Sequence, residues 1–95
     1  MIIEFDKSFE KSLDKIKNKS LYPRIEKIIL EFENSKSLSD LTNIKKLIGF
    51  KNYYRVRIGE YRLGFELLSK NTLRFIIDAH RKDIYKSFPK FSHRR

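Results

Sequence analysis

Residues 52–67, NYYRVRIGEYRLGFEL, alternate apolar and charged side chains on both sides of Gly59-Glu60. Successive side chains of a strand point to opposite faces, so this alternation predicts two half-buried strands. Glycine at the first position of a two-residue loop suits a type II′ turn, because it takes positive φ without a Cβ clash. The apolar face of the predicted hairpin holds Tyr54, Val56, Ile58, Tyr61, Leu63, Phe65 and Leu67. The opposite face presents three arginines, Arg55, Arg57 and Arg62.

The segment before the hairpin predicts one strand and two helices. Residues 1–5, MIIEF, are β-prone, and Asp6 is a good N-cap for a helix that follows. Pro23 suits the first turn of a second helix. The apolar positions are Phe9, Leu13 and Ile16 in the first helix, and Ile25, Ile28, Ile29 and Phe32 in the second. We expect both stripes to pack into a core, as amphipathic helices usually do.

The segment after the hairpin predicts another strand. Its alternating apolar positions are Leu73, Phe75, Ile77 and Ala79, and the opposite face carries Arg74, Ile76, Asp78 and His80. If this strand pairs antiparallel with the preceding one, His80 and Arg81 should end near the arginine face of the hairpin. Residues 81–85 are typical of a turn or short helix, which Pro89 would not allow to continue.

The predicted architecture is a single α+β domain over residues 1–95. An N-terminal strand is followed by a two-helix hairpin and a three-stranded antiparallel meander. The two helices cover the apolar face of the sheet, and the charged face stays open as a shallow basic concavity. Residues 90–95 should form a flexible basic tail.

The net charge of +10 is concentrated in two segments. Residues 1–44 carry eight basic and eight acidic side chains, whereas residues 45–62 and 81–95 each carry six basic and one acidic. Such segregation favours a phosphate-rich partner, and a solubilising surface or a docking patch for an acidic protein is the alternative. The lysines predicted to contact RNA are Lys45, Lys46, Lys51, Lys82 and Lys86.

The composition excludes several classes of protein. The absence of cysteine removes disulfides, thiolate nucleophiles and cysteine metal sites. No apolar run approaches the ~18 residues that span a bilayer, and acidic residues at positions 4, 6 and 10 do not fit a signal peptide. We therefore expect a cytoplasmic protein with no membrane partner.

Six polar side chains can converge on one site: Arg55, Arg57, Arg62, His80, Arg81 and Tyr85. RNA cleavage by a 2′-hydroxyl needs cations for the phosphate, a base for the hydroxyl and an acid for the leaving oxygen. Arginine forks fit phosphate oxygens but are poor bases, so His80 is the candidate that titrates near neutrality. A strand-end histidine without a catalytic role is the other interpretation. Tyr85 could stack on a base, and neither a metal nor another cofactor is expected.

Tyr53 to Phe65, YYRVRIGEYRLGF, followed by His80 to Tyr85, HRKDIY, resembles the RelE branch of the RelE/ParE toxins. The resemblance implies a β-α-α-β-β-β fold and residue roles at five positions. Arg55 and Arg57 match two basic positions of the family's hairpin, where the best-known branch has lysines. Arg62 matches the phosphate-binding arginine, and Arg81 and Tyr85 match a C-terminal arginine and a base-stacking tyrosine.

The resemblance also implies a function and partners. RelE-like toxins of type II toxin–antitoxin systems are metal-independent endoribonucleases that cut mRNA in the ribosomal A site, beside 16S rRNA, and so inhibit translation. A cognate antitoxin protein would neutralise the toxin, and promoter DNA would be bound only by the toxin–antitoxin complex. The alternatives are a gyrase inhibitor without nuclease activity, as in the ParE branch, and an inert toxin that binds only its antitoxin.

Overall fold

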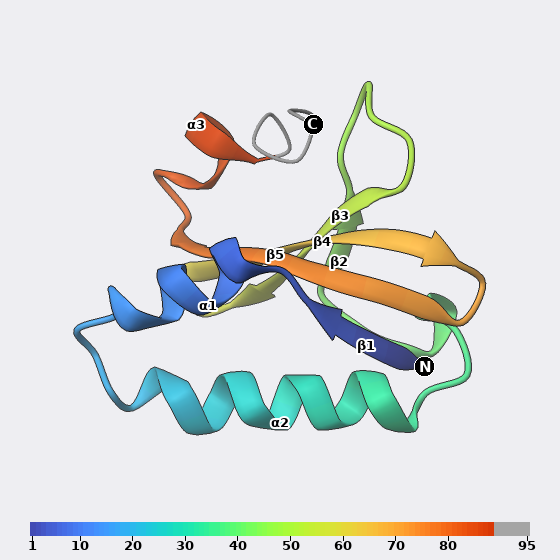
Figure 1. Ribbon diagram of the computed structural model, residues 1–95, viewed down its shortest axis with the longest axis horizontal. Coiled ribbons are helices and arrows are strands. Elements are labelled where there is room, and N and C mark those ends of the chain that lie inside the picture. The colour runs from blue at the N-terminus through green and yellow to red at the C-terminus, as the bar shows by residue number, and fades with distance from the viewer. Residues whose placement is uncertain (89–95) are drawn as a thin grey trace.

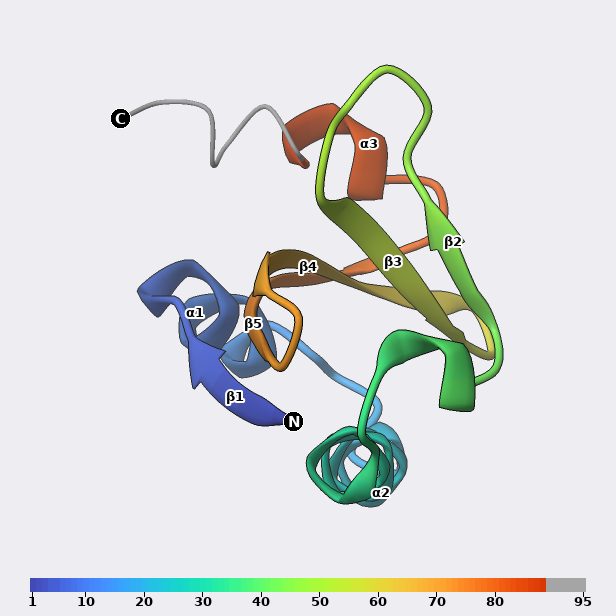
Figure 2. The same cartoon turned by 90° about the vertical axis from the view of Figure 1, so that its right-hand side faces the viewer.

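The computed structural model describes residues 1–88, which form a five-stranded sheet with helices on both faces (Figure 1, Figure 2). The sheet order is β1-β5-β4-β3-β2. The predicted basic tail and Pro89 lie outside the described residues. The elements in chain order are β1 (Ile2–Phe5), α1 (Lys7–Asp14), α2 (Leu21–Asn34), the 3-10 helix η1 (Leu38–Asp40), β2 (Ile44–Lys46), β3 (Tyr53–Ile58), β4 (Tyr61–Ser69), β5 (Thr72–His80) and α3 (Ile84–Ser87).

The predicted α+β architecture is confirmed, with one unpredicted strand, β2, at an edge of the sheet. Strands β3, β4 and β5 form the antiparallel meander, and β1 pairs with β5 in parallel. Strand β2 was not predicted, because its three residues, Ile44–Lys46, contain one apolar position and therefore no alternation. The Gly59-Glu60 turn has the expected form: the φ angle of Gly59 is +58°, and Glu60 has no positive φ.

Helices α1 and α2 bury the predicted apolar face of the sheet. Asp6 caps α1 by accepting a hydrogen bond from the Ser8 backbone N–H at 3.0 Å. Four phenylalanines meet at the centre of this core and are almost fully buried, one from α1, one from α2 and two from the sheet. They are Phe9, Phe32, Phe65 and Phe75. The aromatic cluster fixes the sheet against both helices.

The opposite face of the sheet is only partly open, whereas the prediction left all of it open. A second apolar cluster lies there, built from the β2–β3 loop, the sheet and α3, which stands on this side in Figure 2. Its buried members are Leu47, Tyr53, Ile76, Ile84 and Phe88. Apolar side chains from the two basic segments, together with Ile76, therefore cover part of the sheet face that carries the arginines.

A β-bulge in β5 changes which side chains share a face. Gly64 pairs with Ile77 and Phe65 pairs with Phe75, so Ile76 is an extra residue without a partner on β4. Beyond this point Ile77 and Ala79 pack against the second cluster, not against the main core as the alternation predicted. As a result, every side chain of β5 after the bulge lies on the opposite face of the sheet from the one that the alternation predicted.

No helix within residues 1–88 is both long and apolar enough to cross a membrane.

Candidate active site

Five of the predicted site residues line one shallow pocket of about 430 Å³. They come from four parts of the chain: β3, β4, the segment after β5, and α3. They are Arg55, Arg62, Arg81, Lys82 and Tyr85. We call this the arginine pocket. Three guanidinium groups, one ammonium group and one phenol therefore converge, and they include four of the six side chains predicted to converge.

The hairpin register brings the arginines of β3 and β4 together. Arg57 lies directly opposite Arg62, and Arg55 lies opposite Gly64. The half-buried Arg55 donates from Nη1 to the carbonyl of Asn43 at 3.3 Å, while its buried Nε has no acceptor among residues 1–88. A buried N–H without an acceptor is costly, so a ligand oxygen at this position would be favoured.

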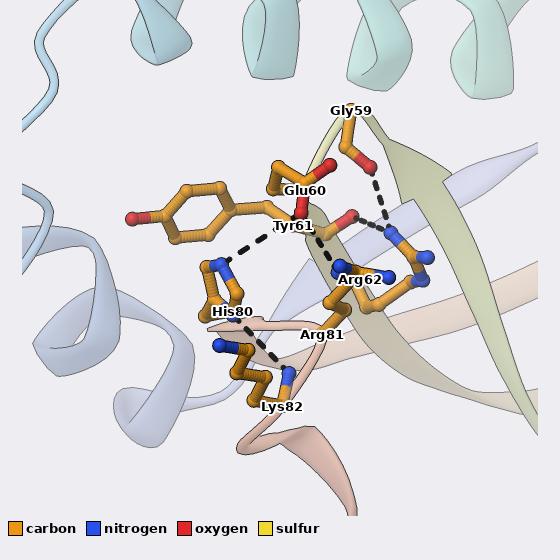
Figure 3. A network of polar contacts seen from close by, with 7 residues as sticks. All are labelled: Gly59, Glu60, Tyr61, Arg62, His80, Arg81 and Lys82. Carbon is orange, nitrogen blue, oxygen red and sulfur yellow. Dashed lines mark hydrogen bonds and ion pairs between the residues drawn. The ribbon is translucent and has the colours of Figure 1, made fainter.

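Arg62 is held by the turn that precedes it. Its Nη1 donates to the carbonyl oxygens of Gly59 at 2.9 Å and of Tyr61 at 3.0 Å (Figure 3). Burial lowers the pKa of Arg62, and the positive charges of Arg55 and Arg57 lower it further. The guanidinium remains charged at neutral pH, and a bound anion would relieve this repulsion.

Arg81 is held by the same turn through Glu60. The Arg81 Nε lies 2.7 Å from Glu60 Oε1, and the Arg81 backbone N–H donates to the Glu60 carbonyl at 2.8 Å. The exposed carboxylate of Glu60 therefore fixes Arg81 beside the pocket without burying its charge.

His80 lies on the other side of the sheet from the arginines, which corrects the predicted placement. It pairs with Tyr61 across the strands and packs edge-on against the Tyr61 ring at 5.6 Å, whereas Arg62 pairs with Ala79. The Ile76 bulge is the cause, because without it His80 would share the face of Arg62. His80 Nδ1 accepts from the Lys82 backbone N–H at 3.2 Å, and Nε2 lies 4.0 Å from Glu60 Oε1 (Figure 3).

Tyr85 joins the arginine pocket to a neighbouring apolar pocket. It is 59% exposed and lines both. The second pocket has a volume of about 390 Å³, with apolar walls and two of the predicted RNA-binding lysines at its rim. Its lining consists of Lys45, Lys46, Leu47, Ile48, Phe50, Tyr85 and Phe88. An exposed phenol beside apolar walls is suited to stacking on a nucleobase.

Three further predicted residues, in addition to His80, Lys45 and Lys46, lie apart from the arginine pocket. Arg57 lines a separate hollow beside α2, together with Arg62 and Arg81. Lys51 is exposed in the β2–β3 loop, and Lys86 Nζ pairs with Asp83 Oδ1 at 3.1 Å.

Sequence reasoning missed Arg24 and Lys27, which also line the hollow beside α2. Both lie on the polar side of α2, and no pattern in the chain links that side to the hairpin turn. The burial of Asp78 on the α1 side of the sheet was also not predicted, because the alternation placed it on the open, charged face. Within residues 1–88 no group of three or more His, Cys, Asp or Glu side chains is arranged to share a metal ion.

Comparison with known proteins identifies a close relative. No protein-family model matches the chain. Toxin RelE3 of Methanocaldococcus jannaschii is 44% identical over 90 residues, covering 94% of this chain and 100% of that protein. The toxin of the RelB-RelE antitoxin–toxin complex from Methanococcus jannaschii superposes with a TM-score of 0.75 and 42% identity, covering 90% of this chain and 99% of that one.

A more distant structure supports the fold alone. The E. coli RelBE toxin–antitoxin complex contains a chain with a TM-score of 0.62 and 21% identity, covering 83% of this chain and 94% of that one. The sheet with two helices on one face is thus shared at low identity. Because identity to the archaeal toxin reaches 44% over nearly the full length of both proteins, the chain belongs to the RelE family of toxins.

Proposed function

We propose that this RelE-family protein is an endoribonuclease that cleaves mRNA in the ribosomal A site and so inhibits translation. One observation carries the proposal: Arg55, Arg62 and Arg81 converge with Tyr85 in a single pocket. Arginine forks match the oxygens of a phosphodiester, and three of them around one pocket favour the charge that develops on phosphorus. Family membership supports the same activity.

The proposed reaction is transesterification within the RNA strand. The 2′-oxygen forms a bond to phosphorus as the bond from phosphorus to the 5′-oxygen breaks. One proton leaves the 2′-hydroxyl and one joins the departing 5′-oxygen, so the products are a 2′,3′-cyclic phosphate and a 5′-hydroxyl. Water is not consumed, and no electron is gained or lost.

The residues of the pocket supply charge and position in this scheme. Arg62, held by two turn carbonyls, would bind the phosphate between Arg55 and Arg81. Tyr85 would stack on the adjacent base, and the Lys82 ammonium can give a proton to the 5′-oxygen. His80 faces away from the pocket, so we assign the 2′-proton to solvent hydroxide and not to His80.

We further propose that a cognate antitoxin neutralises the protein. The similar toxin from Methanococcus jannaschii is bound to RelB in its solved structure. The concentration of positive charge around the pocket would suit an acidic segment of such a partner.

Induced expression in E. coli tests the proposed function. We expect amino-acid incorporation to fall before DNA synthesis falls. New mRNA ends should appear within codons, and plasmid supercoiling should stay unchanged. Loss of supercoiling with intact mRNA would overturn the nuclease proposal in favour of gyrase inhibition. Normal growth with folded, antitoxin-free protein would overturn both in favour of an inert toxin.

A further inference from the structure

A larger hollow lies between α2 and the turn of the β3–β4 hairpin, with a volume of about 660 Å³. We call it the α2 cleft. Its walls come from α2, from residues 42–43 and from the hairpin turn, and they carry five cations and two carboxylates. The cations are Arg24, Lys27, Arg57, Arg62 and Arg81, and the carboxylates are Glu31 and Glu60. One of the two carboxylates, Glu60, is already paired with Arg81.

Four of these cations form no ion pair. Arg24, Lys27, Arg57 and Arg62 lie within 4.0 Å of no carboxylate oxygen in residues 1–88. Like charges along one cleft repel one another, and an anion bound between them would remove that repulsion. The cleft therefore has the electrostatic character of an anion site.

Arg24 reaches from α2 to the hairpin turn. A Cβ atom added at Gly59 would lie 3.2 Å from Arg24 Nη1 and 3.3 Å from Nη2, so the guanidinium rests against the bare backbone of the turn. Gly59 thus gives the turn its positive φ and also leaves room for Arg24. In Figure 3 helix α2 lies across from the turn of the β3–β4 hairpin.

The α2 cleft is continuous with the arginine pocket. Arg62 and Arg81 line both hollows. A strand with a phosphate on Arg62 can therefore run towards Arg57 and Arg24, whose guanidinium forks suit further phosphates. The walls are mainly polar side chains, which favours backbone contacts over base stacking.

We propose that the α2 cleft binds the phosphodiester backbone of RNA outside the cleaved bond, with Arg24 and Arg57 as its main ligands. This inference rests on the proposed function, because Arg62 and Arg81 contribute to both sites. The backbone can belong to the mRNA that flanks the cut or to ribosomal RNA beside it. Both have the same chemistry, and the experiment distinguishes them.

The test measures binding rather than cleavage. The probes are a fluorescent single-stranded RNA, 2′-O-methylated so that it cannot be cut, and empty ribosomes without mRNA. Dissociation constants are measured over a range of salt for the wild type, Arg24→Gln, Arg24→Lys and Lys11→Gln. Lys11 is an exposed lysine of α1 outside the cleft, so Lys11→Gln is a control that removes one positive charge elsewhere.

We expect Arg24→Gln to weaken binding to RNA. The slope of the logarithm of the binding constant against the logarithm of the salt concentration should become shallower by about 0.7, the value for one lost phosphate contact to single-stranded RNA. Arg24→Lys should keep most of the slope, and Lys11→Gln should match the wild type. If Arg24→Gln weakens binding to the oligonucleotide, the cleft is assigned to mRNA. If Arg24→Gln weakens binding to empty ribosomes alone, the cleft is assigned to ribosomal RNA. Either result supports the proposal.

Two results would overturn the inference, and they differ in what else they overturn. If the wild type binds RNA and Arg24→Gln behaves like Lys11→Gln on both probes, the α2 cleft is not an RNA site but the proposed function stands. If the wild type binds neither probe, the cleft assignment and the proposed function fail together.

Discussion

Arg62 stands between the two basic hollows and contacts the turn that separates them. Its guanidinium lines both the arginine pocket and the α2 cleft, and two turn carbonyls fix its direction. Its pKa is lowered by burial and by neighbouring arginines, so a bound phosphate would relieve repulsion at this guanidinium. We expect the reaction to depend on it more than on any other side chain.

Arg62→Ala should lower the rate of mRNA cleavage on the ribosome by about 10²–10³, the usual effect of removing one preorganised donor to a developing negative charge. Arg74→Ala is the matched control, because Arg74 pairs with Glu4 at 3.0 Å on the edge β1–β5 pair. Single-turnover rates for both variants make the comparison. Equal rates in the two variants would remove Arg62 from the mechanism.

His80→Gln should change the cleavage rate far less than the ~10²-fold or greater loss expected for a catalytic base. The reason is its position: His80 contacts Tyr61 and Glu60, on the side of the sheet away from Arg62. The pH profile is the second readout. A histidine base gives a rate that levels off near neutral pH, whereas we predict a continued rise in both proteins. A plateau present only in the wild type would restore His80 as the base.

At the level of elements, α3 reaches the arginine pocket by packing on a glycine of β4. A Cβ atom added at Gly64 would lie 2.8 Å from the Phe88 ring, which is fully buried. This contact holds the end of α3 against the sheet and so places Tyr85 beside the arginines. Glycine within a strand here marks a close approach of another side chain.

Gly64→Ala should therefore destabilise the protein by about 1–3 kcal/mol, as overpacking of a core does, and also slow cleavage. Phe88→Ala removes the ring that the new methyl group would meet. In a double-mutant cycle measured by urea unfolding, Gly64→Ala should cost clearly less in the Phe88→Ala background. An equal cost in both backgrounds would show that Gly64 and Phe88 do not pack as described.

The elements show how far the sequence predicts this fold and where it stops. The alternation on either side of Gly59 was sufficient to predict β3, β4 and the face that carries the arginines. Apolar side chains at every second residue are compatible with only one assignment of side chains to the two faces of the sheet. In β5 the adjacent apolar residues Ile76 and Ile77 fit either face, so the bulge and the reversal of His80 could not be foreseen. Arg24 contributes to the α2 cleft only through tertiary packing, which helical periodicity does not describe.

At the scale of the whole molecule, the sheet separates a helix-covered core from a basic face that is partly covered. One carboxyl group is buried at the core side: Asp78 is 5% exposed, lies opposite Leu63, and its carboxyl oxygens have no hydrogen-bond partner within residues 1–88. Its backbone N–H donates to Ser12 Oγ of α1 at 2.9 Å. Burial raises the pKa of Asp78 from 3.8 to about 7.

The stability of the fold should consequently fall as pH rises from about 4 to about 7 through Asp78. In that window the folded protein keeps a proton that the unfolded chain has lost, so each step upward in pH favours unfolding. Asp78→Asn cannot ionise and should be more stable than the wild type at pH 8, by at most roughly 4 kcal/mol.

Urea unfolding of both proteins at several pH values isolates this effect. Asp6, whose pKa is lowered mainly by its hydrogen bond from the Ser8 hydroxyl, is present in both proteins and cancels in the difference. A stability difference that does not grow between pH 4 and pH 7 would show that Asp78 is ionised in the folded state.

Cleavage of mRNA on a programmed ribosome with an empty A site tests the central claim most directly. The purified, antitoxin-free wild type should cut within the A-site codon, leave a 2′,3′-cyclic phosphate and a 5′-hydroxyl, and act far more slowly on the same mRNA without ribosomes. An uncut mRNA, or a cut that leaves a 3′-hydroxyl, would contradict the proposal that the arginine pocket promotes attack by the 2′-hydroxyl.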